Sequence, residues 1–192
     1  MLASRNRAQL LIVDVQTRLA PQIAGREDIE GNVHTLAKAA ATLRIPVTLT
    51  EHYASGLGAT VAAVREAAGA SAVTLDKIEF SCLRNPRLKE RLEGLAREGR
   101  EEIVIAGMEA HVCVMQTALD LRAAGHHVFL VADAAGSQAP ASRELAIERM
   151  REAGVVIAST AMIVFEWLER ADTPEFRTLL PLLKRSLSRR AG

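Results

Sequence analysis

Three side chains in this sequence have the types and spacing that a cysteine-dependent reaction needs. Asp14 ends an apolar run near the N-terminus, Lys77 follows another apolar run, and Cys113 begins a stretch with helical spacing. A thiol in the first turn of a helix feels the positive end of the helix dipole, and a nearby ammonium adds to that field. We therefore expect Cys113 to be a nucleophile whose thiolate is favoured. Asp14 would take the thiol proton and return it to a leaving amine, and Lys77 would hold both anionic groups.

Each of these residues also has an ordinary structural interpretation. An isolated cysteine is most often a small buried apolar side chain, an aspartate can cap a helix, and a lysine is usually a solvated charge. What favours the chemical interpretation is that three complementary groups are expected at one edge of a sheet. Cys82 follows Phe80 and Ser81 in a segment without a comparable setting, and we predict that it is structural.

Short apolar runs alternate with longer stretches rich in Ala, Leu, Glu and Arg, a pattern typical of an α/β fold. The expected strands are 9–13, 46–50, 72–75, 103–106, 127–132 and 155–157. The expected helices are 32–43, 57–67, 86–97, 112–123, 140–153 and 161–168. Because the strands are mostly apolar, both faces of the sheet should be covered. We predict a three-layer, doubly wound sheet of six parallel strands, with ligands bound at the carboxyl ends of the strands.

The chain length and charge narrow the classes of function. A chain of 192 residues fits one domain, so we expect residues 1–192 to form a single unit. The formal net charge is +1 and aromatic residues make up only 3%, which disfavours nucleic-acid binding. Apolar helical faces favour a homo-oligomer, a dimer or larger.

The cysteine content and the hydropathy pattern bear on cellular location. Cys82 and Cys113 are too few for a disulfide framework, and they are not clustered as a zinc site requires. Asp14 interrupts the N-terminal apolar run, which is too short for a signal peptide, and no segment approaches the length of a membrane span. We expect a cytoplasmic protein with no membrane association, no metal and no cofactor.

The tail, from about residue 173 to residue 192, allows two interpretations. Leucines at 179, 180, 182 and 183 precede four basic residues, at 184, 185, 189 and 190. The segment is either an amphipathic helix that docks on a partner subunit or a leucine-anchored end with a frayed basic terminus. We favour the second interpretation.

Four motifs in order resemble those of the isochorismatase-like cysteine hydrolases, a superfamily that includes nicotinamidases, N-carbamoylsarcosine amidohydrolases and isochorismatases. The motifs are residues 11–16 around Asp14, 76–81 around Lys77, 107–114 around Cys113, and 131–137 with Asp133 and Ser137. The similarity spans nearly the whole chain. The residues at 107–109 and 51–53 are most similar to those of the isochorismatase-domain-containing subgroup.

The resemblance implies a catalytic triad of Asp14, Lys77 and Cys113 and a covalent acyl-enzyme intermediate. It implies the strand order 3-2-1-4-5-6 and a non-proline cis peptide, which we place at Met108–Glu109. It also implies an oxyanion hole formed by the backbone N–H groups of Glu109 and Cys113; such groups at the start of a helix lack partners within the helix. The implied activity is hydrolysis of a small amide or related C–N bond.

Departures from the family pattern narrow this expectation. Nicotinamidases have an Asp-x-His motif and a further histidine after the second strand, whereas here residues 50–53 are followed by no second histidine, which argues against their metal site. True isochorismatases cleave a vinyl ether without needing the cysteine, so Cys113 points to amide or related acyl substrates. Candidate pocket residues are Leu19, Tyr53, Phe80 and His111.

Two other classes of function compete with this interpretation. Residues 55–61 form a glycine-containing turn before a helix, as in a dinucleotide-binding motif, but the third glycine is missing and the segment follows the second strand. The stronger competitor is a non-catalytic oligomeric scaffold or interaction protein with a vestigial pocket, because a fold does not guarantee activity.

Overall fold

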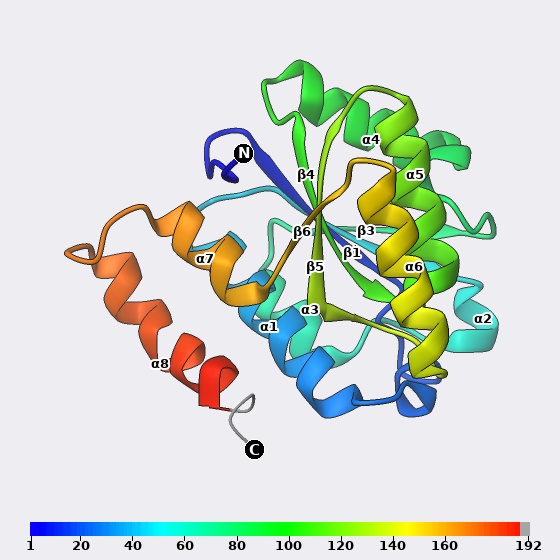
Figure 1. The fold of residues 1–192 in the computed structure, drawn as a ribbon, viewed down its shortest axis with the longest axis horizontal. Helices are drawn as coiled ribbons and strands as arrows, with labels where there is room; N and C mark the ends of the chain where they lie inside the picture. The colour runs from blue at the N-terminus through cyan, green and yellow to red at the C-terminus, as the bar shows by residue number, and fades with distance from the viewer. Residues whose placement is uncertain (189–192) are drawn as a thin grey trace.

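The computed structural model describes residues 1–188, which form one six-stranded parallel sheet covered by helices (Figure 1). The strands are β1 (Ala8–Val13), β2 (Val47–His52), β3 (Val73–Lys77), β4 (Glu102–Met108), β5 (His127–Gly136) and β6 (Val156–Ala158). Their order in the sheet is β3-β2-β1-β4-β5-β6, and every pair is parallel. The predicted fold class and strand order are therefore confirmed.

The helices alternate with the strands along the chain. They are α1 (Arg26–Thr42), α2 (Ala54–Leu57), α3 (Ala62–Ala68), α4 (Pro86–Arg97), α5 (Met115–Ala123), α6 (Pro140–Glu152), α7 (Thr160–Leu168) and α8 (Pro174–Ser188). Single turns η1 (Ala20–Gln22), η2 (Cys82–Arg84) and η3 (Ala110–Val114) join some of them. Pro86 and the Asn85 side chain, which accepts from Leu88 N–H, set the start of α4.

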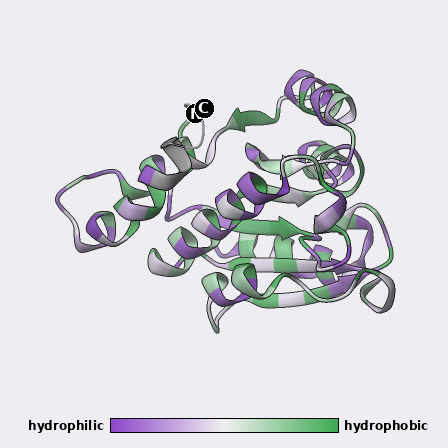
Figure 2. Cartoon of the chain, turned by 90° about the horizontal axis from the view of Figure 1, so that it is seen from below, coloured by the Kyte–Doolittle hydropathy of each residue, from purple (hydrophilic) through white to green (hydrophobic). Residues whose placement is uncertain are grey.

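Helices cover both faces of the sheet (Figure 1). The sheet thereby separates two apolar cores. Leu10 and Ile12 of β1 pack with α1, α3 and α7, while Leu11 and Val13 pack with α4, α5 and α6 on the other face. Side chains alternate across a strand, so a β1 that is buried on both faces is apolar at every position except Gln9, whose buried amide donates to the backbone carbonyls of Leu92 and Arg100. The strands are accordingly hydrophobic along most of their length (Figure 2).

Parallel pairing brings the carboxyl ends of the central strands to one edge of the sheet. Val13 pairs with Thr50 of β2 and with Gly107 of β4, while His52 pairs with Lys77 of β3. The residues that follow β1 and β4 therefore lie beside the last residues of β2 and β3. This edge is where a doubly wound sheet binds its ligands.

The structure differs from the expected elements mainly after β2. The single helix expected over 57–67 is wrong, because Gly58 has φ of 80° and the chain leaves the helix there. Thr60 then bridges to Gln16 and donates through its N–H and its hydroxyl to Glu51, so α3 begins only at Ala62. Strand ends differ from the expected ones by up to four residues, as β5 shows by continuing to Gly136.

Helix α8 folds back on its own chain. It packs against α1 and α7 (Figure 1). Leu179 and Leu183 are fully buried in the core there. The leucine-rich face is thus anchored within the protomer, as the favoured interpretation predicted. The basic residues Arg189 and Arg190 lie outside the described residues. Among the described residues, no helix combines the length and apolar character needed to cross a bilayer.

Candidate active site

Asp14 is the residue at which the chain leaves β1. Its φ is 52°, a left-handed conformation that aspartate adopts more readily than most residues. The side chain is buried, and its Oδ1 accepts a hydrogen bond of 2.5 Å from the Thr50 hydroxyl of the neighbouring strand. The carboxylate is therefore held in place from the β2 side.

Lys77 is the last residue of β3 and reaches across β2 to the same carboxylate. Its Nζ lies 2.6 Å from Asp14 Oδ2, and the two side chains are 0% and 1% exposed. Burial by itself would lower the pKa of Lys77, but the charge of the neighbouring Asp14 carboxylate and its hydrogen bond raise it. The lysine is consequently an ammonium at every physiological pH.

Cys113 reaches the site through the segment after β4. The Met108–Glu109 peptide bond is cis, at the position where we expected it, and the chain then makes the single π-helical turn η3 before α5 begins. Cys113 lies in this turn with 6% of its surface exposed. Its Sγ is within 4.8 Å of a carboxylate oxygen of Asp14, so the thiol and the proposed base adjoin each other.

The expectation that the resting thiolate is favoured is wrong. Burial, and then the Asp14 carboxylate, raise the pKa of Cys113 above that of a free thiol, while Lys77 opposes them only in part. A buried sulfur loses the solvation that stabilises its charged form, and this loss outweighs the field of the ammonium. Cys113 is therefore a protonated thiol at rest, and its proton must leave during the reaction.

His52 is a fourth residue of this site that the sequence reasoning did not select. One of its ring nitrogens lies within 4.8 Å of both an Asp14 oxygen and Cys113 Sγ, and its Nδ1 is 3.5 Å from Lys77 Nζ. The signal available in the sequence was its position at the end of the second strand, the same edge as the other three. Thr50 was not predicted either, although it lies two residues before His52 and so faces the same side of β2.

Asp14, His52 and Cys113 offer an oxygen, a nitrogen and a sulfur, which are ligand types that zinc accepts. The ammonium of Lys77 lies among the same atoms, 2.6 Å from Asp14 and 3.5 Å from His52. It already supplies a positive charge there, and a divalent cation at this place would be repelled by it. The donor set therefore fits the buried ammonium of Lys77 better than a metal ion.

Cys82 lies closer to the site than its sequence context suggested. It is completely buried in the core between the sheet and α4, and its N–H donates to the Thr117 hydroxyl. Burial and the Asp14 carboxylate raise the pKa of Cys82 to about 11. Its environment is that of a packed, protonated thiol.

The turn that carries Cys113 is fastened to the end of β5. His111 Nδ1 lies 2.9 Å from the hydroxyl of the buried Ser137, and the Glu109 carboxylate accepts from the N–H of Gln138. His111 thus joins the turn to the residue that follows β5. Asp133, in the middle of β5, instead accepts from the N–H and hydroxyl of Thr160 and fastens α7.

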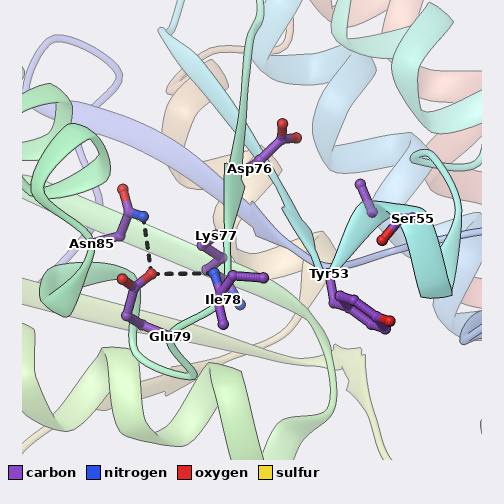
Figure 3. A pocket seen from close by; sticks show the side chains of 8 residues that line it. Tyr53, Ser55, Asp76, Lys77, Ile78, Glu79 and Asn85 are labelled. Carbon is purple, nitrogen blue, oxygen red and sulfur yellow. Dashed lines mark hydrogen bonds between the residues drawn. The ribbon is translucent and has the colours of Figure 1, made fainter.

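Of the other predicted pocket residues, Phe80 contacts the site, because its ring stacks on that of His52. Leu19 is half-buried and packs on the core, Phe80 is 51% exposed, and Tyr53 is exposed at the start of α2. Tyr53 lines a shallow cavity of about 340 Å³ along the edge of β3, opposite Glu79 and Asn85 (Figure 3). That cavity is bordered by Lys77 but by neither Asp14 nor Cys113.

The glycines of residues 55–61 have an explanation within the chain. A Cβ at Gly56 would lie 2.2 Å from the Tyr53 ring, and one at Gly58 would lie 2.3 Å from the Thr17 hydroxyl. Gly58 O also accepts from Gln16 Nε2. These glycines permit close packing of the loop on its own neighbours, so they do not require a bound dinucleotide.

Comparison with known proteins agrees with this architecture. The model of the isochorismatase domain family matches residues 8–162, which include Asp14, Lys77 and Cys113. The chain belongs to the isochorismatase family. This membership supports a hydrolase-type enzyme.

Individual isochorismatase-family proteins are similar over most of the chain. The secreted isochorismatase effector Isc1 of Phytophthora sojae (strain P6497) is 32% identical over 185 residues, covering 95% of this chain and 87% of that protein. Isochorismatase domain-containing protein 2B of Mus musculus is 32% identical over 176 residues, covering 91% of this chain and 80% of that protein.

Solved structures show the same fold. The MAR1 ribonuclease of Caenorhabditis elegans superimposes with a TM-score of 0.87 at 29% identity, covering 95% of this chain and 92% of that one. The ycaC gene product of Escherichia coli, described as an octameric hydrolase of unknown specificity, has a TM-score of 0.86 at 23% identity, covering 100% and 97% of the two chains.

Proposed function

We propose that this isochorismatase-family protein hydrolyses a small amide or related C–N bond with Cys113 as nucleophile, Asp14 as general base and acid, and Lys77 as their electrostatic partner. The observation that carries the proposal is the convergence of the three groups at the carboxyl edge of the sheet. Lys77 Nζ is 2.6 Å from Asp14 Oδ2, and Cys113 Sγ is within 4.8 Å of an Asp14 oxygen.

In the first half of the reaction, Sγ of Cys113 attacks the carbonyl carbon while its proton passes to the Asp14 carboxylate. The thiol is protonated at rest, so this transfer makes the nucleophile when it is needed. The carbonyl oxygen becomes an oxyanion, bound by the backbone N–H groups of Glu109 and Cys113. Asp14 then gives the proton to the nitrogen, the C–N bond breaks, and an amine leaves behind a thioester on Cys113.

In the second half, a water molecule attacks the thioester carbonyl and gives a proton to Asp14. The C–S bond breaks, the carboxylic acid leaves, and the proton returns from Asp14 to Sγ. The net change consumes one water and yields an acid and an amine. Lys77 keeps its proton throughout, because its role is to offset the negative charge that moves between the carboxylate and the sulfur.

We further propose that residues 1–192 act as one domain, that the substrate is a small molecule, and that the protein works as a homo-oligomer. The octameric description of a structural neighbour belongs to that protein, and here it motivates only a measurement of the oligomeric state. The scaffold alternative predicts the same fold and assembly without turnover.

Ammonia or amine release from a panel of primary amides and carbamoyl compounds tests the proposal. We expect turnover by the wild type, a loss of about 10² to 10⁴ in kcat/KM in Asp14→Asn, and no turnover in Cys113→Ala. Cys82→Ala removes the other thiol and should retain most of the activity. An RNA substrate belongs in the panel, and cleavage of RNA without cleavage of any amide would contradict the proposal, as would a fully inert wild type.

A further inference from the structure

His52 occupies a fixed place beside the triad, yet the mechanism above does not use it. It is the last residue of β2, and its backbone is held on both sides by the buried side chain of Gln16. The N–H of His52 donates to Gln16 Oε1 at 2.8 Å, and its carbonyl oxygen accepts from Gln16 Nε2 at 3.1 Å. Since Gln16 follows Asp14 by two residues, His52 is positioned relative to the catalytic carboxylate.

The imidazole ring itself is also fixed. It stacks on Phe80 with the ring centroids 5.4 Å apart and an angle of 26° between the planes. Nδ1 lies 3.5 Å from Lys77 Nζ, at the long end of hydrogen-bonding distance. Backbone and ring contacts together direct this nitrogen at the ammonium.

Four charged or titratable groups face the ring from the elements around it. They are Lys77 on β3, Asp14 at the end of β1, Glu79 in the loop after β3, and Cys113 in η3. Burial and then the Lys77 ammonium lower the pKa of His52, and they outweigh Asp14 and Glu79, which act in the opposite direction. The ring is therefore neutral near pH 7, and its Nδ1 is available as an acceptor towards the ammonium.

We propose that His52 is a positioning residue for Lys77, whose ammonium it orients by accepting at Nδ1. An ammonium has three N–H donors and can rotate about its Cε–Nζ bond. Asp14 accepts one donor at 2.6 Å, and His52 accepts a second, which leaves the third directed into the space beside Cys113. This inference rests on the proposed function, because it assumes that Lys77 stabilises charge on the sulfur.

Two substitutions of His52 distinguish the role of the Nδ1 acceptor from that of the stacked aromatic ring. His52→Asn places an amide oxygen the same number of bonds from Cα as Nδ1, without a titrating group. His52→Phe keeps a flat ring that can stack on Phe80 but has no acceptor. If the acceptor matters, the Asn variant should resemble the wild type and the Phe variant should not.

The readout is the rate at which iodoacetamide alkylates Cys113 at pH 8, followed by mass spectrometry of the Cys113 peptide. We expect the Phe variant to react about tenfold more slowly than the wild type, as for loss of a hydrogen bond to a charged group, and the Asn variant to remain within about threefold. Equal rates in the two variants, whether both fall or neither does, would overturn the proposal. Far-UV circular dichroism verifies that each variant is folded.

Nitrogen-15 NMR of the wild-type histidine rings provides a test that needs no variant to fold. The proposal expects an unprotonated Nδ1 and a protonated Nε2 on His52 at pH 7, and a titration midpoint below 6.5. A proton on Nδ1 at pH 7 would contradict it. Neither readout requires turnover. Failure to cleave any amide would therefore contradict only the proposed function. Equal alkylation rates of Cys113 in the two variants of an active hydrolase would contradict only the proposed role of His52.

Discussion

Lys77 Nζ and Asp14 Oδ2 form an ion pair of 2.6 Å with both side chains removed from solvent. The pair joins the end of β3 to the end of β1 across β2, and Thr50 adds a hydrogen bond to the other carboxylate oxygen. In a buried ion pair each charge stabilises the other, because a single buried charge would have neither a counter-charge nor solvent beside it.

This dependence predicts the outcome of a double-mutant cycle on stability. Lys77→Met leaves the Asp14 carboxylate buried and uncompensated, and we expect it to lower the free energy of unfolding by about 3–5 kcal/mol. Adding Asp14→Asn removes the stranded charge and should restore much of the loss. Urea unfolding of the two single variants and the double variant measures the coupling. Losses that simply add would show that the two side chains do not interact.

The buried thiol of Cys82 predicts a loss of stability in alkaline solution. Its pKa is raised to about 11 in the folded protein, so between the ordinary thiol pKa of 9.0 and 11 the unfolded chain releases a proton that the folded chain retains. The contribution of Cys82 to the free energy of unfolding is therefore fully present below about pH 9. The free energy of unfolding falls as pH rises through that window, by up to about 3 kcal/mol.

Thermal unfolding at pH 7.5 and 10.5 compares the wild type with Cys82→Ala. The variant is expected to be less stable at pH 7.5, because it leaves a small cavity, but its further loss at pH 10.5 should be smaller than that of the wild type. An identical alkaline loss in both proteins would mean that Cys82 does not titrate on unfolding.

The close approach of β4 to β1 at Gly107 predicts a sharp sensitivity to substitution. Gly107 has φ of 128°, and a Cβ there would lie 2.0 Å from the carbonyl oxygen of Val13, the residue before Asp14. Gly107→Ala should therefore displace the strand that leads to Cys113 and destabilise the protein severely. Gly125→Ala is the matched control, because its φ is 90° but a Cβ meets nothing within 4 Å.

The control variant should lose only about 1–2 kcal/mol, the conformational cost of a left-handed alanine. Guanidinium unfolding compares the two variants. A Gly107→Ala protein as stable as Gly125→Ala would show that the strands do not meet as closely as described.

The attachment of the nucleophile turn to β5 predicts a role for His111 in rate. His111→Ala removes the contact with the Ser137 hydroxyl, and we expect kcat to fall about tenfold, within the range for loss of one hydrogen bond. His111→Asn keeps a hydrogen-bonding atom at the place of Nδ1 and should retain most of the rate. If kcat is equally low in both variants, the Ser137 contact is not what positions the turn.

The sequence was sufficient to predict the parallel sheet and the strand edge at which Asp14, Lys77 and Cys113 lie together. Apolar strands interrupted by Gly, Pro and amphipathic helices specify a parallel sheet, and such a sheet brings strand ends such as Val13 and Lys77 to one edge. The break after Gly58 was not predicted, because it depends on Thr60 contacting Glu51 and Gln16, which are distant along the chain.

The electrostatics of the site could not be read from residue types. Helix position and a neighbouring lysine suggested a favoured thiolate at Cys113, but the degree of burial, which only the folded chain reveals, raises its pKa instead. His52 was missed for a related reason. Its importance depends on the distance from its ring to Lys77, and an isolated histidine after a strand carries no such information.

If Cys113 carries the acyl group during turnover, mass spectrometry of the acid-quenched enzyme should detect the covalent adduct. With a cleaved amide present, the wild type should show a mass increase equal to the acyl portion of the substrate. The increase should be on the Cys113 peptide, with the Cys82 peptide unchanged. Undiminished hydrolysis by Cys113→Ala, or an adduct on any other residue, would contradict the claim.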